Sequence, residues 1–169
     1  MEFFTSGSAA IFFQLFFALI LGALLGIERV MAHKTAGMRT YALVAMGSSL
    51  FVIVSQYMGS MTGSASSFVL MQIPAAIVTG IGFLGAGLII FKDDKLSGLT
   101  TAAGLWVTAG IGIAVGFKLY FIAFIATLLT LLIFTVLWYI ENAFRRMDGK
   151  IFSLHDEQEA ITREMGDQN

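Results

Sequence analysis

The stretch that decides the fold is Leu99–Ile140, LTTAAGLWVTAGIGIAVGFKLYFIAFIATLLTLLIFTVLWYI, in which Lys118 is the only charged residue. A helix needs about 20 apolar residues to cross the roughly 30 Å hydrocarbon core of a bilayer. The tract has about twice that length, so it is too long for one spanning helix. Gly116-Phe117-Lys118 interrupts it near the middle. We therefore predict two membrane helices joined by a tight turn at these three residues.

Three more apolar runs precede this tract. None of the five runs contains Asp, Glu, Lys or Arg, each of which costs about 2.5–3.5 kcal/mol at the centre of a spanning helix. The predicted spans are Ala9–Ile27, Thr40–Met58, Phe68–Phe91, Leu99–Phe117 and Leu119–Ile140. Lipid offers no partner for open backbone groups, and the runs do not alternate in polarity, so helices are expected rather than a β-barrel. The predicted fold is an all-α integral membrane protein, a bundle of five transmembrane helices.

The composition agrees with this fold and excludes other classes of protein. Of the 169 residues, 57% are hydrophobic and 12% are charged, whereas a soluble domain has roughly 25% charged residues. With 10 basic and 11 acidic residues, the chain has no basic footprint for nucleic acid. The lack of cysteine excludes disulfides, thiolate metal sites and cysteine nucleophiles.

The distribution of Lys and Arg predicts the orientation. With five spans, one side of the membrane holds the first loop, the third loop and the C-terminal tail. That side carries every Lys and Arg except Lys118, out of 10 in the chain. Because cytoplasmic loops carry such an excess, we expect the N-terminus outside and the C-terminus in the cytoplasm. Residues 1–140 then form the transmembrane domain, and residues 141–169 form a short polar cytoplasmic tail.

The first cytoplasmic loop contains one candidate functional cluster. Its members are Glu28, Arg29, Lys34, Gly37, Arg39 and Thr40. Glu28 directly follows an apolar span, so its carboxylate lies at the membrane boundary and needs a partner, which Arg29 or Arg39 can supply. Such a cluster could bind a cation, a lipid phosphate or a partner protein. In the alternative interpretation, its basic residues only mark topology at the lipid headgroups.

A second polar group lies in the third loop and at the start of the following helix. Asp93 and Asp94 offer the hard oxygen ligands that Mg²⁺ prefers, and together with Glu28 they are the candidate metal ligands. The flanking lysines offset the charge of the two carboxylates, so a solvated cytoplasmic turn is the favoured interpretation. The helix-start motif that follows consists of Ser97, Gly98, Thr100 and Thr101. Ser97 is the expected N-cap, and the free N–H groups of the first turn favour an anion or a carboxylate such as that of Glu28.

A glycine-rich block lies inside the third predicted span. It consists of Gly80, Gly82, Phe83, Gly85 and Gly87. A dinucleotide-binding loop is rejected, because that motif needs a preceding strand and a βαβ unit. The glycines fit either close helix packing or a helix broken near the membrane centre, six residues after Pro74. Two GxxxG motifs, Gly22–Gly26 and Gly112–Gly116, favour packing without deciding whether they join helices of one chain or of two.

Taken together, these segments resemble the MgtC/SapB family of bacterial membrane proteins. The matching stretches are LLGIER (Leu24–Arg29), the spaced Lys34 with AGMRTYALVAMG (Ala36–Gly47), GIGFLGAGLI (Gly80–Ile89) and GLTTAAGLW (Gly98–Trp106). They occur in consistent order between about residue 18 and residue 120. Before the glycine block the family commonly has an Asp-Pro pair, then an Arg and later a Gln. The chain departs from this pattern there, because Val69–Ala76 contains neither Asp nor Arg.

The resemblance implies a multi-pass protein of the bacterial cytoplasmic (inner) membrane, linked to magnesium limitation, acid stress and survival inside host cells. It implies other membrane proteins as partners, the F-type ATP synthase among them, in addition to membrane lipids. Larger members carry a soluble C-terminal domain, and regulation through such a domain is not expected here.

Two functions remain as hypotheses. The first is a regulatory membrane protein that contacts other membrane proteins, indicated by the small-residue helix faces and the uncharged membrane centre. The second is a channel or transporter for Mg²⁺ or another divalent cation; the spans contain no acid to mark an ion path, but a homo-oligomer would multiply Glu28 around an axis. No cofactor is expected, with Mg²⁺ only as ligand or substrate. An enzyme is not expected, because the sequence has no HExxH, no GxSxG and no histidine within a span.

Overall fold

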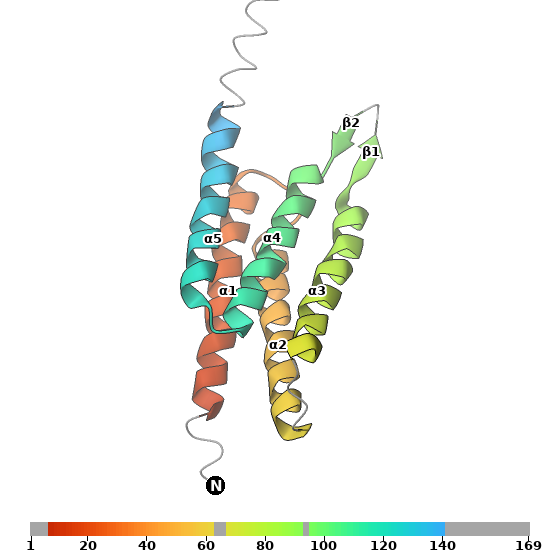
Figure 1. The fold of residues 1–169 in the computed structure, drawn as a ribbon. Coiled ribbons are helices and arrows are strands. Elements are labelled where there is room, and N and C mark those ends of the chain that lie inside the picture. The colour runs from red at the N-terminus through yellow and green to blue at the C-terminus, as the bar shows by residue number, and fades with distance from the viewer. Residues whose placement is uncertain (1–6, 63–66, 93–94, 141–169) are drawn as a thin grey trace, which may run out of the picture. The chain divides into compact units, whose positions relative to one another are not determined.

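The computed structural model describes residues 7–62, 67–92 and 95–140, which form five long helices and a short β-hairpin (Figure 1). The helices are α1 (Gly7–Met31), α2 (Met38–Thr62), α3 (Ser67–Leu88), α4 (Leu99–Gly116) and α5 (Tyr120–Leu132). All five are long and apolar enough to cross a membrane, with α5 counted to Ile140. The predicted membrane fold of five helices is therefore confirmed for this part of the chain.

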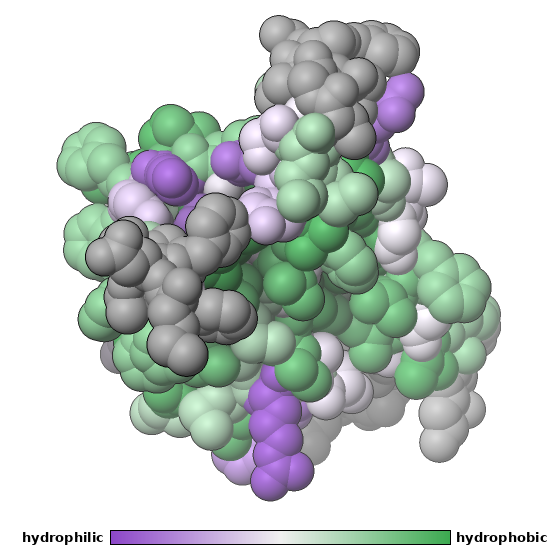
Figure 2. Space-filling model, turned by 90° about the horizontal axis from the view of Figure 1, so that it is seen from below, coloured by the Kyte–Doolittle hydropathy of each residue, from purple (hydrophilic) through white to green (hydrophobic). Residues whose placement is uncertain are grey.

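The chain divides into two compact units at Leu131. The first unit contains α1 to α4, the hairpin and nearly all of α5. The described part of the second unit is a helical segment that includes one π-helical stretch, η2 (Ile133–Leu137). Figure 2 looks at the end where α1 begins, and most of the surface visible there is hydrophobic. The predicted tail, residues 141–169, lies outside the described residues.

The hairpin corrects the prediction for the third loop. The helix α3 ends at Leu88, three residues before the predicted boundary, because Ile90–Lys92 (β1) pairs antiparallel with Lys95–Ser97 (β2). The apolar run does continue to Phe91, but its last residues are extended. The candidate metal ligands Asp93 and Asp94 lie outside the described residues.

The predicted N-cap at Ser97 is wrong. Ser97 belongs to β2, where it pairs with Ile90, and its Oγ donates a hydrogen bond to the Ile90 carbonyl oxygen over 3.2 Å. Gly98 is the N-cap instead, with φ of 87° and no side-chain cap. A Cβ at Gly98 would overlap the carbonyl oxygen of Leu88. The left-handed backbone and the close approach of α3 therefore both require glycine at this position.

The turn predicted at Gly116-Phe117-Lys118 is confirmed. Lys118 adopts a φ of 63°, and its N–H donates to the Val115 carbonyl over 2.8 Å, while the N–H of Leu119 donates to the Ala114 carbonyl over 2.9 Å. These two bonds form a Schellman motif, which ends a helix and satisfies its last carbonyls. The 42-residue tract therefore folds as two helices in sequence.

The helix α2 is the centre of the first unit, and both GxxxG motifs pack against it. A Cβ added at Gly22 of α1 would lie 2.8 Å from the Ala45 Cβ, and one added at Gly112 of α4 would overlap the Ala45 carbonyl oxygen. Gly26 meets Met38 and Gly116 meets Val52 in the same way. These motifs therefore join helices within one chain, as small residues do in lipid. The largest fully buried side chains include Leu25, Tyr41, Val52, Leu105, Ile111 and Val115.

Several polar side chains within the spans donate to backbone carbonyls. The Nε2 of Gln14 in α1 donates to the carbonyls of Val115 and Gly116, each over 2.7 Å, and the Nε2 of Gln56 in α2 donates to Gly116 over 2.9 Å. Thr79, Thr108, Thr127 and Thr130 each donate to the carbonyl four residues earlier. The two glutamines thus cover the end of α4 and give the Gly116 carbonyl two side-chain donors.

The helix α3 remains helical through the glycine block, so the alternative of a broken helix is wrong. Gly85 packs on α4, where its Cβ would lie 3.5 Å from the Ala102 Cβ. A Cβ at Gly80, Gly82 or Gly87 would meet nothing within 4 Å, and Phe83 is 82% exposed. Close packing within the chain therefore accounts for only one glycine of the block.

Candidate functional site

The candidate site lies at the basic end of the first unit, defined here as the end where α1 and α3 finish and α2 and α4 begin (Figure 1). Arg29 is in the last turn of α1. Its Nε lies 3.2 Å from Oε2 of Glu28, and the two side chains are 3% and 15% exposed, respectively. The expected partner of Glu28 is therefore Arg29 rather than Arg39. Because Arg29 is buried, it is more than a surface charge that marks topology.

Tyr41 of α2 and Thr101 of α4 complete the site. Tyr41 is fully buried and lies within electrostatic range of both Arg29 and Glu28. Its hydroxyl donates to the carbonyl oxygen of Thr101 over 3.4 Å. Three helices thus meet around one ion pair, and Tyr41 connects the end of α1 to the start of α4.

Local sequence explains why these groups come together. Gly26 brings the last turns of α1 against Met38, because any larger side chain there would overlap the backbone of α2. After Met31 the chain turns at His33, whose φ is 54°, and the N–H groups of His33 and Lys34 donate to the Val30 and Arg29 carbonyls. This Schellman motif ends α1 directly after the ion pair.

The side chains of the other members of the predicted cluster lie mostly at the surface. Lys34, Arg39 and Thr40 are exposed, and Gly37 is half-buried beside the Val30 side chain. In the helix-start motif, Thr100 is exposed, and the structure brings only Thr101 to the site. The glycine block lies on α3, and its Gly85 packs beside Ala102, the neighbour of Thr101. The predicted residues thus divide into a buried pair and an exposed basic surface.

At the site, the charges of the Glu28 carboxylate and the Arg29 guanidinium offset each other. A cation at Glu28 would have to compete with Arg29, whose guanidinium is always charged. Among the described residues, no group of three or more His, Asp or Glu side chains could hold a metal ion. Glu28 is the one carboxylate among the described residues, so water or groups outside them would have to fill the other octahedral positions around Mg²⁺.

Sequence reasoning missed Tyr41 and the role of the two glutamines. Tyr41 directly follows Arg39-Thr40 at the start of an apolar span, so its burial could have been expected. A buried tyrosine hydroxyl normally needs a hydrogen-bond partner, and this was the available signal. For Gln14 and Gln56 the signal was their isolation in apolar runs, since a buried amide must be hydrogen-bonded. Neither signal identifies the partner.

Comparisons with known proteins identify the family. The model of the MgtC family matches residues 15–143. The chain belongs to the MgtC family. This match includes all the candidate site residues of α1, α2 and α4.

Relatives within the family are similar over most of the chain. YhiD of Escherichia coli (strain K12), named as a candidate magnesium transporter, is 41% identical over 131 residues, which are 76% of this chain and 61% of YhiD. The protein MgtC of Salmonella typhimurium (strain LT2) is 46% identical over 114 residues, 68% of this chain and 46% of MgtC. SrpB of Synechococcus elongatus is 41% identical over 128 residues, 71% of this chain and 70% of SrpB. The chain thus spans less than two thirds of YhiD and of MgtC. No solved structure matches it.

Proposed function

We propose that the protein is a regulator of magnesium homeostasis in the bacterial cytoplasmic membrane and acts by contacting other membrane proteins from its basic end. In this proposal the N-terminus lies outside and the basic end lies at the cytoplasmic surface, as the Lys and Arg distribution predicts. The observation that carries the proposal is the buried Glu28–Arg29 pair beside Tyr41. Tyr41 of α2 donates to Thr101 of α4, and the exposed Lys34 and Arg39 lie at the same end of the unit.

The residues of the spans support regulation over transport. Gln14 and Gln56, which could have lined an ion path, donate to the carbonyls at the end of α4 instead. The buried hydroxyls of Thr108 and Thr127 donate within their own helices. These donations leave the amide and hydroxyl oxygens free, so the support for regulation is that the five apolar runs contain no Asp or Glu to mark an ion path.

We infer that the F-type ATP synthase is a candidate partner, as the family resemblance implies, with exposed basic residues meeting acidic groups at the cytoplasmic surface. Stress adaptation and virulence would then follow from control of that partner. This proposal needs no ion to pass through the protein.

Transport of Mg²⁺ is the second candidate, favoured by the name of YhiD. In this alternative the Glu28 carboxylates of several copies would surround one axis. A single copy offers Glu28 paired with Arg29, so assembly would have to loosen that pair.

Two measurements on the full chain separate the candidates. The first is Mg²⁺ entry into liposomes that contain purified, folded protein, with Glu28→Gln as the matched control. The second is crosslinking in cells, with Arg39→Ala compared against a deletion of residues 157–169. Regulation predicts no Mg²⁺ entry and the capture of one membrane protein that Arg39→Ala releases and the deletion retains. Entry that Glu28→Gln abolishes would instead establish transport.

A further inference from the structure

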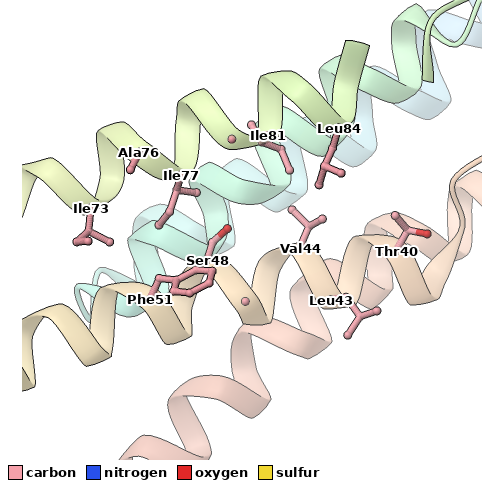
Figure 3. A pocket seen from close by; sticks show the side chains of 12 residues that line it. Thr40, Leu43, Val44, Ser48, Phe51, Ile73, Ala76, Ile77, Ile81 and Leu84 are labelled. Atoms are coloured by element: carbon pink, nitrogen blue, oxygen red, sulfur yellow. The ribbon is translucent and has the colours of Figure 1, made fainter. Parts of the chain in front are cut away.

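A slot lined almost entirely by apolar side chains separates α2 from α3 in the first unit (Figure 3). Its volume is about 630 Å³, within the roughly 300–1,000 Å³ of small-molecule pockets. It extends from Thr40 and Leu84, near the basic end, to Phe51 and Ile73. Leu84 and Phe51 are 51% and 61% exposed, so the slot opens sideways on the surface that faces lipid.

Two glycines keep the slot open. Gly47 of α2 and Gly80 of α3 both line it, and a Cβ added at either would meet nothing within 4 Å. A side chain at either position would therefore enter the slot. This gives Gly80 a role that packing within the chain does not, because the helix contact of α3 with α4 lies at Gly85.

The length of the slot matches one leaflet of a bilayer. Thr40 and Phe51 on α2 are 11 residues apart, as are Ile73 and Leu84 on α3, and 11 residues of helix span about 16 Å. Half of the roughly 30 Å hydrocarbon core is about 15 Å. The slot is therefore long enough to hold one hydrocarbon chain of that leaflet along its length.

The end of the slot near the basic end has the chemistry of an anion site. Thr40 lines the slot there, and the exposed Arg39 precedes it in the first turn of α2. Arg39 forms no ion pair with any residue that the structure describes. The free N–H groups of a first helical turn also favour a phosphate. Arg39 is thus the sequence neighbour of a residue that lines the end of the slot, and an apolar slot of one-leaflet length with a basic residue near its end suits an anionic phospholipid.

We propose that the slot binds one acyl chain of an anionic phospholipid from the leaflet at the basic end, with the lipid phosphate at Arg39 and Thr40. Lipid tails are as apolar as the slot, so burial of apolar surface gives an acyl chain little preference for the slot over the surrounding bilayer. The shape of the slot selects a chain, and Arg39 selects the charge. The slot part of the proposal does not depend on the proposed regulatory function, whereas Arg39 is shared by both proposals.

The test uses the full chain in phosphatidylcholine vesicles that contain a small fraction of phosphatidylglycerol with a photoactivatable group in the middle of an acyl chain. Crosslinked positions are mapped by mass spectrometry. We expect crosslinks on both walls of the slot, and a loss of at least about tenfold in Gly80→Leu and Gly47→Leu, which corresponds to 1.4 kcal/mol. Gly110→Leu is the matched control, because Gly110 is also open but lies outside the slot. Its crosslinking should equal that of the unmodified chain.

The headgroup is tested with Arg39→Gln and with a phosphatidylcholine probe. Arg39→Gln should lower the phosphatidylglycerol crosslinks about fivefold, to the phosphatidylcholine level, since one basic residue near the surface contributes about 1 kcal/mol. Equal crosslinking of both lipids to the unmodified chain would overturn the proposal. So would slot crosslinks that persist in a folded Gly80→Leu protein. Disulfide-linked dimers of Leu43→Cys, formed in a chain without other cysteines, would show that a second copy covers the slot and would also overturn it.

Discussion

At the scale of single residues, Glu28 and Arg29 show how two sequence neighbours at the membrane boundary can be buried as an ion pair. They are neighbours in sequence, and their side chains pair at 3.2 Å under the cover of α2. Breaking a buried pair leaves one charge uncompensated, which costs far more than removing both partners. Each side chain of the pair thus compensates the charge of the other.

Arg29→Met should therefore destabilise the protein more than the double variant Glu28→Gln/Arg29→Met. We expect the single change to cost about 3 kcal/mol, the lower limit for a broken buried pair, because Glu28 retains 15% exposure. The measurement is unfolding of the purified protein in mixed micelles with increasing denaturing detergent. A double variant that is less stable than Arg29→Met would contradict this assignment of the pair.

Two glycines of α4 provide a matched test of helix packing. Gly112→Ala places a methyl group against the Ala45 carbonyl oxygen, whereas Gly110→Ala places it in open space. We expect Gly112→Ala to lower the midpoint of thermal unfolding and Gly110→Ala to raise it slightly, because alanine favours a helix by about 1 kcal/mol over glycine. Both variants are followed by circular dichroism in the same detergent. Equal midpoints would mean that Gly112 is not a contact between helices.

The residue scale is also where sequence reasoning reached its limit. The spacing of Gly22–Gly26 and Gly112–Gly116 predicted close contacts, but a single helix face does not specify which neighbour it meets. Ser97 had the composition of an N-cap, yet pairing with Ile90 placed it in a strand. Its neighbour Gly98 is needed for a backbone contact with Leu88, and that contact exists only after folding.

At the scale of elements, the end of α4 is the point where three helices are joined by hydrogen bonds. The Gly116 carbonyl accepts from both Gln14 and Gln56. If one glutamine is replaced, the other still donates to the Gly116 carbonyl. The loss of both leaves a carbonyl in an apolar environment, which costs about 1–3 kcal/mol.

Gln14→Leu and Gln56→Leu should consequently be non-additive. We expect each single change to cost less than about 1 kcal/mol, near the average for hydrogen bonds between membrane helices, and the double change to cost more than their sum. The free energies come from the same micelle unfolding experiment, treated as a double-mutant cycle. Strict additivity would show that the two amides do not share one acceptor.

Helices were the most predictable elements, and the hairpin was the least. Uninterrupted apolar runs fix where spans occur, because the bilayer rejects charges regardless of their tertiary neighbours. The predicted break at residues 116–118 is likewise local, since a Schellman motif needs only a few residues. The strands β1 and β2 form by pairing with each other, which neither segment reveals by itself. The apolar residues 89–91 therefore predicted a continuation of α3.

At the scale of the whole molecule, the orientation remains a prediction that labelling can test. The chain has no cysteine, so Lys118→Cys and Thr35→Cys each introduce a single thiol at an exposed position. In intact cells, a membrane-impermeant maleimide should label Lys118→Cys and leave Thr35→Cys unlabelled until the membrane is opened. The reverse pattern would place the basic end outside, and with it the proposed contact surface.

The glutamine contacts at the end of α4 also imply an order of events during biosynthesis. A growing chain emerges N-terminus first, so α1 and α2 reach the bilayer while α4 is still being translated. The amides of Gln14 and Gln56 therefore enter the bilayer before the carbonyls that accept their hydrogen bonds have been synthesised. The first two helices therefore lack these hydrogen bonds until α4 is inserted.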